Sequence, residues 1–172
     1  MNRKGVSGLK PFIIPLFIPH LGCKQQCSFC NQRTLTGSAK ALSVAEAERI
    51  IEEQLSWPRK HPEQAAEIAF YGGSFTALEP SRQQVFLELA QQYVLQGKVS
   101  SIRLSTRPDC LEQEQINLLR RYAVQTVEIG VQSMDEKVLR LTRRGHSAVE
   151  VRAARERLKK NSIACAFQLL LG

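Results

Sequence analysis

The stretch HLGCKQQCSFCNQRT, residues 20–34, places Cys23, Cys27 and Cys30 within eight residues in a C-x₃-C-x₂-C spacing. The chain has five cysteines in all, and the next one, Cys110, lies 80 residues further on. Structural zinc prefers four protein ligands, often as two C-x₂-C pairs, and only Cys27 and Cys30 form such a pair here. Three thiolates can instead hold three irons of a [4Fe–4S] cluster and leave the fourth iron open to another ligand. The spacing favours such a cluster.

A zinc site is the alternative reading of the same cysteines, with His20 or the distant Cys110 as the fourth ligand. A zinc-binding module without enzymatic activity would follow from it. A disulfide framework is not expected, because the cysteine count is odd and the N-terminal MNRKGVSGLK does not have the pattern of a signal peptide. We therefore expect a cytoplasmic protein with reduced thiols.

Length and composition are those of one ordinary globular domain. The chain has 172 residues, of which 43% are hydrophobic and 23% charged. No run approaches the roughly 18 apolar residues of a membrane span, so no membrane partner is expected. The formal net charge of +8 suits a nucleic acid, a phosphorylated substrate or an anionic cofactor.

Apolar, β-branched runs alternate with helical patterns along the chain. The expected strands are residues 12–18, 67–73, 101–109, 126–133 and 163–172, and the expected helices are residues 42–57, 79–96, 111–123, 134–147 and 148–161. Ser43 and Glu46 fit a helix N-terminus, and Pro58 should end that helix. This alternation predicts an α/β fold with parallel strands, either an open sheet or part of a (β/α) barrel. Ligands bind at the C-terminal strand ends of both.

The distinctive residues follow the expected strands. The cysteines come after the first strand, Gly72–Gly73 after the second, Ser105–Arg107 after the third and Gln132–Ser133 after the fourth. Paired glycines allow close backbone approach to a ligand, although a strand-to-helix turn needs them as well. A buried glutamine at an apolar strand end requires hydrogen-bond partners, which favours a binding role for Gln132.

The motif C-x₃-C-x₂-C, with Phe29 before its last cysteine, resembles that of the radical S-adenosylmethionine (SAM) superfamily. The segments IPHLGCKQQCSFCNQ and STRPD…EIGVQS…RRGH most resemble the radical domain of Elongator's catalytic subunit and its bacterial relatives. A weaker likeness runs to oxygen-independent coproporphyrinogen oxidase. The resemblance covers essentially the whole chain. It implies a [4Fe–4S] cluster on Cys23, Cys27 and Cys30 that reductively cleaves SAM to a 5′-deoxyadenosyl radical, which takes a hydrogen from the substrate.

The resemblance also implies a set of cofactor contacts. It assigns SAM binding to Phe29, Gly72, Gly73, Ser74, Ser105, Arg107, Gln132 and Arg144, with Arg144 on the methionine carboxylate. Ser105 stands where relatives carry a carboxylate, and Arg107 is read either as an anion binder that compensates for this or as one half of a surface salt bridge. Gln168 stands where some relatives carry an aspartate. Glu128 is left without a role, and His146 is read as a helix cap.

The family barrel usually has six βα units, and the sequence ends on the fifth expected strand. We therefore expect a single, incomplete radical SAM core that spans residues 1–172 and is poorly stable and inactive alone. The implied partners are SAM and an electron donor such as flavodoxin or ferredoxin. RNA is the favoured substrate because of the basic charge and the relatives, and a small porphyrinogen-like molecule is the alternative.

Overall fold

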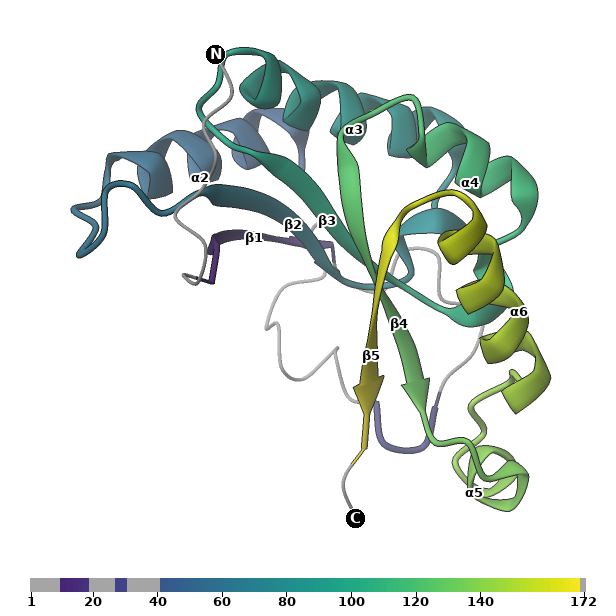
Figure 1. Cartoon of the computed structure of the whole chain (residues 1–172). Helices are drawn as coiled ribbons and strands as arrows, with labels where there is room; N and C mark the ends of the chain where they lie inside the picture. Colours follow the sequence, from purple (N-terminus) through teal and green to yellow (C-terminus); the bar gives the residue numbers. More distant parts are fainter. Residues whose placement is uncertain (1–9, 19–26, 31–40, 171–172) are drawn as a thin grey trace.

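The computed structural model describes residues 10–18, 27–30 and 41–170. Within them, five parallel strands form one sheet in the order β1-β2-β3-β4-β5 (Figure 1). The strands are β1 (Phe12–Ile18), β2 (Ala66–Gly72), β3 (Ser101–Thr106), β4 (Val124–Gln132) and β5 (Ala164–Leu169). The α/β class and the parallel strands predicted from the sequence are confirmed.

Helices alternate with the strands. They are α2 (Val44–Ser56), α3 (Pro80–Leu95), α4 (Gln113–Leu119), α5 (Glu136–Leu141) and α6 (Ala148–Lys160), with short 3₁₀ turns η1 (Phe75–Ala77) and η2 (Pro108–Cys110). A sheet whose strands follow one another in chain order, with right-handed crossovers, carries its helices on one face. Figure 1 shows α2, α3, α4 and α6 on the same side of the sheet, as in part of a (β/α) barrel.

Local sequence signals account for where the helices begin. The Ser43 side chain accepts a hydrogen bond from the Glu46 amide at 3.2 Å, so the expected N-cap of α2 is confirmed. Ser147 and Glu150 form a reciprocal capping box at the start of α6. Pro80 occupies the first position of α3, where its missing N–H costs nothing.

The core lies between the sheet and the helices. Strand residues that point to this side are fully buried, among them Ile68 and Phe70 of β2, Ile102 and Leu104 of β3, and Val127 and Ile129 of β4. The Phe70 ring contacts Phe75 and Phe86, with centroid distances of 4.8 and 5.9 Å. No helix in the described part of the chain is long and apolar enough to span a bilayer.

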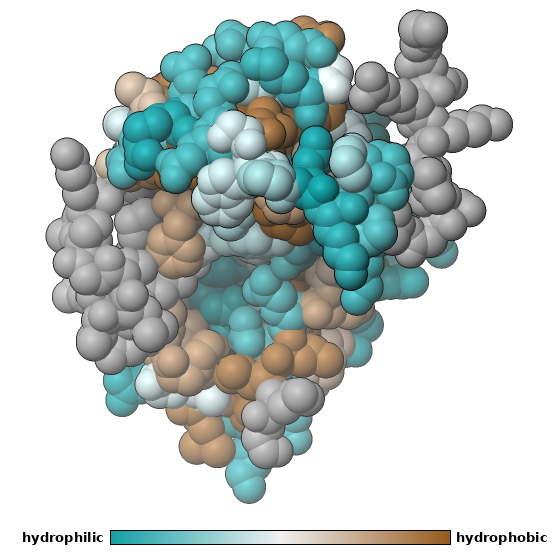
Figure 2. Space-filling model, turned by 90° about the vertical axis from the view of Figure 1, so that its left-hand side faces the viewer, coloured by the Kyte–Doolittle hydropathy of each residue, from teal (hydrophilic) through white to brown (hydrophobic). Residues whose placement is uncertain are grey.

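The other face of the sheet carries polar residues. Glu67 and Tyr71 of β2, Arg103 and Ser105 of β3, and Glu128 of β4 alternate with the core residues and point away from the helices. Seen from the side on which β1 and α2 lie in Figure 1, the molecule has a hollow with a hydrophilic floor and hydrophobic borders (Figure 2). Among the described residues, the fold thus separates an apolar face covered by helices from a polar face that no helix covers, called the uncovered face below.

Candidate functional site

Two of the three clustered cysteines form one described turn. The Cys30 amide donates to the Cys27 carbonyl at 3.0 Å, which closes the turn. The Cys27 thiol is buried, Cys30 is half-buried, and both are free thiols. Phe29 between them is 39% exposed, so its ring is available to a ligand. Cys23 lies outside the described residues.

This cysteine turn is attached to the loop that follows α5. The Ser28 amide donates to the Thr142 carbonyl at 3.0 Å, and the Arg144 guanidinium donates from Nη1 to Cys27 Sγ at 3.3 Å. Arg144 therefore faces the cysteine turn from the unit that contains β4. Its role toward SAM remains a prediction.

Gly130 makes room for this arginine. Arg144 Nη2 donates to the Gly130 carbonyl at 2.5 Å, and a Cβ atom on Gly130 would lie 2.7 Å from the same nitrogen. The Nε atom of Arg144 is buried and has no partner among the described residues. A buried donor without a partner is costly, and a carboxylate ligand would satisfy it.

Arg107 is buried and already occupied. Its Nε and Nη2 donate to the two oxygens of Asp109 at 2.9 and 2.8 Å, and its Nη1 donates to the Arg144 backbone carbonyl at 2.8 Å. Burial lowers the pKa of the Arg107 guanidinium, but hydrogen bonding to Asp109 and its charge outweigh burial and raise this pKa. The salt bridge, one of the two readings open in the sequence, is present and is buried.

The turn after β2 is built from glycine and hydroxyl groups. Gly72 has a φ of +106°, and a Cβ atom there would lie 2.7 Å from the Ile18 carbonyl oxygen. The Gly73 amide donates to the same carbonyl at 2.8 Å. Ser74 Oγ lies 2.7 Å from Thr106 Oγ1, which lies 2.6 Å from Thr76 Oγ1. The glycine pair has a backbone reason of its own, so its cofactor contact remains a prediction.

Gln132, another predicted contact, lies at the end of β4. It adopts a φ of +67°, in the left-handed region that a glutamine rarely occupies. Its backbone carbonyl accepts a hydrogen bond from Leu170, while its half-buried side chain makes no hydrogen bond to any described residue. Strained backbone of this kind clusters at ligand sites, which supports the predicted role without testing it.

Glu128, for which the sequence indicates no role, is the centre of the uncovered face. Its Oε1 accepts from Tyr71 Oη and Arg103 Nη1, both at 3.0 Å, and its Oε2 accepts from Gln168 Nε2 at 2.9 Å. Arg103 also pairs with Glu67 at 3.0 Å. Polar residues at every second position of parallel strands were the available signal, because strands buried on both faces read as continuous apolar runs.

Ser105 takes part in the same network. It is paired with Glu128 across the β3–β4 ladder, and its Oγ accepts a hydrogen bond from Gln168 Nε2 at 3.4 Å. Ser105 is therefore adjacent to a carboxylate on the next strand. Burial and the neighbouring Glu128 raise the pKa of Tyr71 to about 12, so its hydroxyl remains protonated at neutral pH.

His146 is not a helix cap, so this reading was wrong. Thr142 ends α5 and Ser147 caps α6, while His146 is 6% exposed and places Nε2 at 3.1 Å from the Val131 carbonyl. Burial, with Arg144 and Arg107 nearby, lowers the pKa of His146 to about 4. Since a carbonyl only accepts, Nε2 carries the proton and Nδ1 is a buried acceptor without a described partner.

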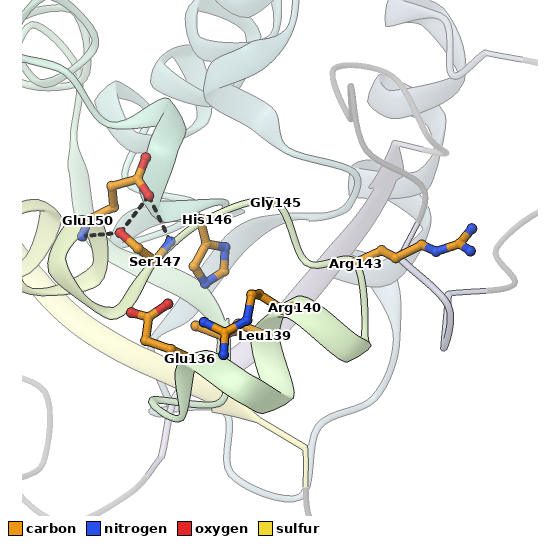
Figure 3. Close-up of a pocket in the computed structure, with 8 residues that line it drawn as sticks. All are labelled: Glu136, Leu139, Arg140, Arg143, Gly145, His146, Ser147 and Glu150. Carbon is orange, nitrogen blue, oxygen red and sulfur yellow. Dashed lines mark hydrogen bonds between the residues drawn. The ribbon is translucent and has the colours of Figure 1, made fainter.

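His146 lines a surface pocket of about 390 Å³ between α5 and the start of α6 (Figure 3). In that view, the capping pair Ser147–Glu150 closes one side of the pocket, and Arg140 and Leu139 lie below the imidazole. The Arg143 side chain points away from these residues. The pocket lies close to the C-terminal end of β4, because the His146 imidazole reaches the Val131 carbonyl there.

The donor set is chemically suited to an iron–sulfur cluster as far as it is described. No group of three metal-ligating side chains occurs within residues 10–18, 27–30 and 41–170. Two soft thiols nevertheless share one turn, and a guanidinium already reaches one of them. Cluster-bound thiolates carry negative charge and accept hydrogen bonds from their surroundings. The cysteine turn and Arg144 therefore fit such a cluster.

Comparison with known proteins identifies a family whose model matches most of the chain. A model described as the radical SAM superfamily matches residues 17–172. A tRNA uridine(34) acetyltransferase of Methanocaldococcus infernus is 30% identical over 129 residues, which are 65% of this chain and 24% of that protein. The chain spans between about a quarter and about half of the curated relatives it matches.

Solved structures share the fold. Elp3 of the archaeon M. infernus, with an N-terminal deletion, superposes with a TM-score of 0.68 at 20% identity, over 94% of this chain and 38% of that one. Coproporphyrinogen III oxidase (HemN) of Escherichia coli superposes with a TM-score of 0.65 at 18% identity, over 94% of this chain and 37% of that one. Both likenesses suggested by the sequence motifs are confirmed.

Proposed function

The chain belongs to the radical SAM superfamily, and from this premise we propose that it binds a [4Fe–4S] cluster and SAM at the C-terminal ends of its strands. When bound, such a cluster supplies the electron that cleaves SAM to methionine and a 5′-deoxyadenosyl radical, which abstracts hydrogen from a substrate. The protein supplies binding, orientation and exclusion of water. Cys23, Cys27 and Cys30 are the proposed ligands.

One observation carries this proposal: a buried guanidinium faces the cysteine turn. Arg144 reaches Cys27 Sγ at 3.3 Å, and its Nε is a buried donor without a described partner. A ligand that binds beside the cysteines would lie next to this positive group. Arginine suits a carboxylate because its fork makes two parallel, charge-assisted hydrogen bonds. We assign the methionine carboxylate of SAM to Arg144.

The remaining proposed contacts surround the same point. Gln132 offers a side chain without a described partner, and Phe29 offers an exposed ring. Ser105 lies on the uncovered face beside Glu128 and Gln168. The Gly72–Gly73 backbone and Ser74, between β2 and η1, complete the proposed set of contacts. Arg107 contributes through its hydrogen bond to the Arg144 carbonyl.

RNA is the proposed substrate class. Residues 135–160 carry nine Lys and Arg against four Asp and Glu, a net +5 out of +8 for the chain. Six of these cations are exposed and form no ion pair among the described residues: Lys137, Arg140, Arg143, Arg152, Lys159 and Lys160. An unpaired cationic surface is what binding to a phosphate backbone requires. The tRNA-modifying relative points to the same substrate class.

Anaerobic reconstitution with iron and sulfide tests the proposed ligands. Each of Cys23→Ala, Cys27→Ala and Cys30→Ala should lose the brown cluster, and Cys165→Ala, a half-buried thiol on β5, is the matched control. Iron retained in Cys27→Ala, or zinc in place of iron in the wild-type protein, would contradict the proposed cluster.

Titration of SAM into the reconstituted protein tests the cofactor site. Arg144→Ala should weaken binding about ten- to a hundredfold, and Gln132→Ala about fivefold, because charge-assisted hydrogen bonds are stronger than neutral ones. Arg143→Ala is the control, since its exposed side chain points away in Figure 3. Equal losses from Arg143→Ala and Arg144→Ala would contradict the assignment of the carboxylate.

RNA binding is measured separately, as the salt dependence of affinity for a tRNA. Changing Arg152 and Lys159 of α6 to Gln should lower the affinity and reduce the slope of affinity against salt by about two released ions. Changing two exposed glutamines to Glu, Gln84 on α3 and Gln125 on β4, alters the net charge by the same two units and is the control. A small-molecule substrate would be favoured if neither pair altered RNA binding.

A further inference from the structure

Arg107 connects the three turns that surround the proposed SAM site. Its backbone amide donates to Ser74 Oγ at 3.2 Å on the turn after β2, and its side chain reaches the loop after α5. We infer that Arg107, held by Asp109, is a positioning residue that orients Arg144 and so sets the affinity for SAM without touching it. This inference rests on the proposed function.

The Arg107 fork is not available to a ligand. Asp109 occupies Nε and Nη2 with two parallel hydrogen bonds, and the Arg144 carbonyl occupies Nη1. The Arg107 side chain is 4% exposed. An arginine that binds SAM directly would have to break a buried, charge-assisted pair first, and removing one partner of such a pair is costly. Direct binding is therefore disfavoured.

The contact that Arg107 makes with Arg144 is on the backbone. The Arg144 amide donates to the Leu139 carbonyl at 2.9 Å, while its carbonyl accepts from Arg107. The peptide groups on both sides of Arg144 are thus fixed, and its side chain extends from a fixed point toward Gly130 and Cys27. A binding group held in place before the ligand arrives loses less conformational entropy on binding.

Asp109 fixes Arg107 in turn. It lies on η2, two residues after Arg107, and Pro108 between them restricts the backbone. The two hydrogen bonds have the fork geometry that arginine forms best with a carboxylate. A lysine at position 107 would keep the charge but could not bind Asp109 in this way and reach the Arg144 carbonyl as well.

A double-mutant cycle on SAM affinity tests the inference in the reconstituted protein. Arg107→Gln should weaken SAM binding about tenfold with iron content unchanged, and Arg107→Lys should not restore it. Asp109→Asn, which retains the shape of the side chain, should weaken binding by a smaller factor. Combining Arg107→Gln with Arg144→Ala should weaken binding no more than Arg144→Ala alone, because a positioning residue acts through its target.

Additive losses in this cycle would overturn the inference, since they would mean that Arg107 contacts SAM itself. Full recovery in Arg107→Lys would also overturn it, because charge alone would then suffice. A purely structural role would lower the unfolding midpoint without changing SAM affinity, and that result would overturn it as well.

Hydrogen exchange in the absence of SAM gives a readout that does not depend on the proposed function. Arg107→Gln should speed amide exchange in the peptide covering residues 142–147, and Arg143→Ala, on the same loop but exposed, should not. Unchanged exchange in Arg107→Gln would overturn the inference that Arg107 fixes the Arg144 backbone. A wild-type protein that binds a cluster but no SAM would instead overturn the proposed function, while the exchange result would still test whether Arg107 fixes this loop.

Discussion

The two faces of the sheet are built from alternate residues of the same strands and differ completely in chemistry. On β2, Ile68 and Phe70 are buried against the helices, whereas Glu67 and Tyr71 point to the uncovered side. Successive side chains of a strand point to opposite faces, so one backbone supports both surfaces. The helix-covered face holds the fold together, and the uncovered face presents polar groups.

The difference shows how polar groups are accommodated in a parallel sheet. Glu67, Arg103 and Glu128 are only 13–20% exposed in their side chains, yet every charged group has an opposite partner at 3.0 Å. Burying a charge without a partner is far more costly than burying it in a hydrogen-bonded pair. The covered face is stabilised by apolar packing, and the uncovered face by the network centred on Glu128.

The largest expected effect lies on the covered face. Phe70→Ala should lower the free energy of unfolding by about 3–5 kcal/mol, because it leaves a cavity beside Phe75 and Phe86. Denaturant unfolding followed by circular dichroism measures this loss. Val85→Ala on α3 removes a side chain that is 43% exposed and should cost under about 0.5 kcal/mol. Similar losses in both variants would show that the covered face is loosely packed.

A pH effect is expected from His146, a polar group buried between α5, α6 and the end of β4. Because the folded state holds the pKa of His146 at about 4, below its unfolded value of about 6.5, unfolding takes up a proton between these values. The stability contributed by neutral His146 is present above pH 6.5 and is lost as pH falls toward 4. This loss should be about 2–3 kcal/mol.

His146→Gln should remove that part of the acid destabilisation, since glutamine can still donate to the Val131 carbonyl but does not titrate. The measurement is the free energy of unfolding at pH 7 and pH 4.5 in both proteins. His61→Gln, at an exposed histidine that lies beside Glu63, is measured in the same way as the control for removing an imidazole. An identical pH dependence in His146→Gln and wild type would mean that folding does not shift the pKa of this imidazole.

On the uncovered face, removal of the shared cation should cost less than a core cavity. Arg103→Ala leaves Glu67 and Glu128 without their counter-ion, and we expect about 2 kcal/mol of destabilisation at pH 7. Unfolding in denaturant measures it. Arg49→Ala breaks an exposed pair with Glu53 and should cost about 0.5 kcal/mol or less. An unchanged free energy of unfolding in Arg103→Ala would show that water already screens the charges of this network.

The smallest effect is expected for one hydrogen bond of the same network. Tyr71→Phe retains the ring and loses only the hydroxyl that donates to Glu128, so it should cost about 1 kcal/mol. Tyr122→Phe is the matched control, because the Tyr122 hydroxyl has no hydrogen-bond partner among the described residues. Equal losses of stability in both variants would mean that water replaces the hydrogen bond between Tyr71 and Glu128 at no cost.

The order and type of the elements followed from the sequence with good accuracy. The expected strand at residues 12–18 matches β1 (Phe12–Ile18), and the helix capped at Ser43 ends at Ser56, before Pro58. Charged residues inside strands were harder to interpret. The sequence indicates no role for Glu128, because its partners come from β2, β3 and β5 and no local pattern shows which strands pair.

The prediction that His146 caps a helix was wrong for a related reason. A histidine after a glycine at a helix end resembles a cap when only neighbouring residues are considered. In the fold, its imidazole reaches the carbonyl of Val131, 15 residues earlier, and is buried between a strand and two helices. Burial is a property of packed elements, so the lowered pKa of His146 could not be read from its neighbours in sequence.

By itself, the sequence determined the spacing of the three cysteines, the alternation of strands and helices, and the caps that begin α2 and α6. These features depend on residues a few positions apart, where backbone geometry sets which groups meet. Only the tertiary structure decided that Arg144 lies against Cys27, 117 residues away, and that Arg107 holds the Arg144 carbonyl. Such contacts arise when parallel strands bring their C-terminal ends to one edge of the sheet, and packing against the helices then sets which side chains touch.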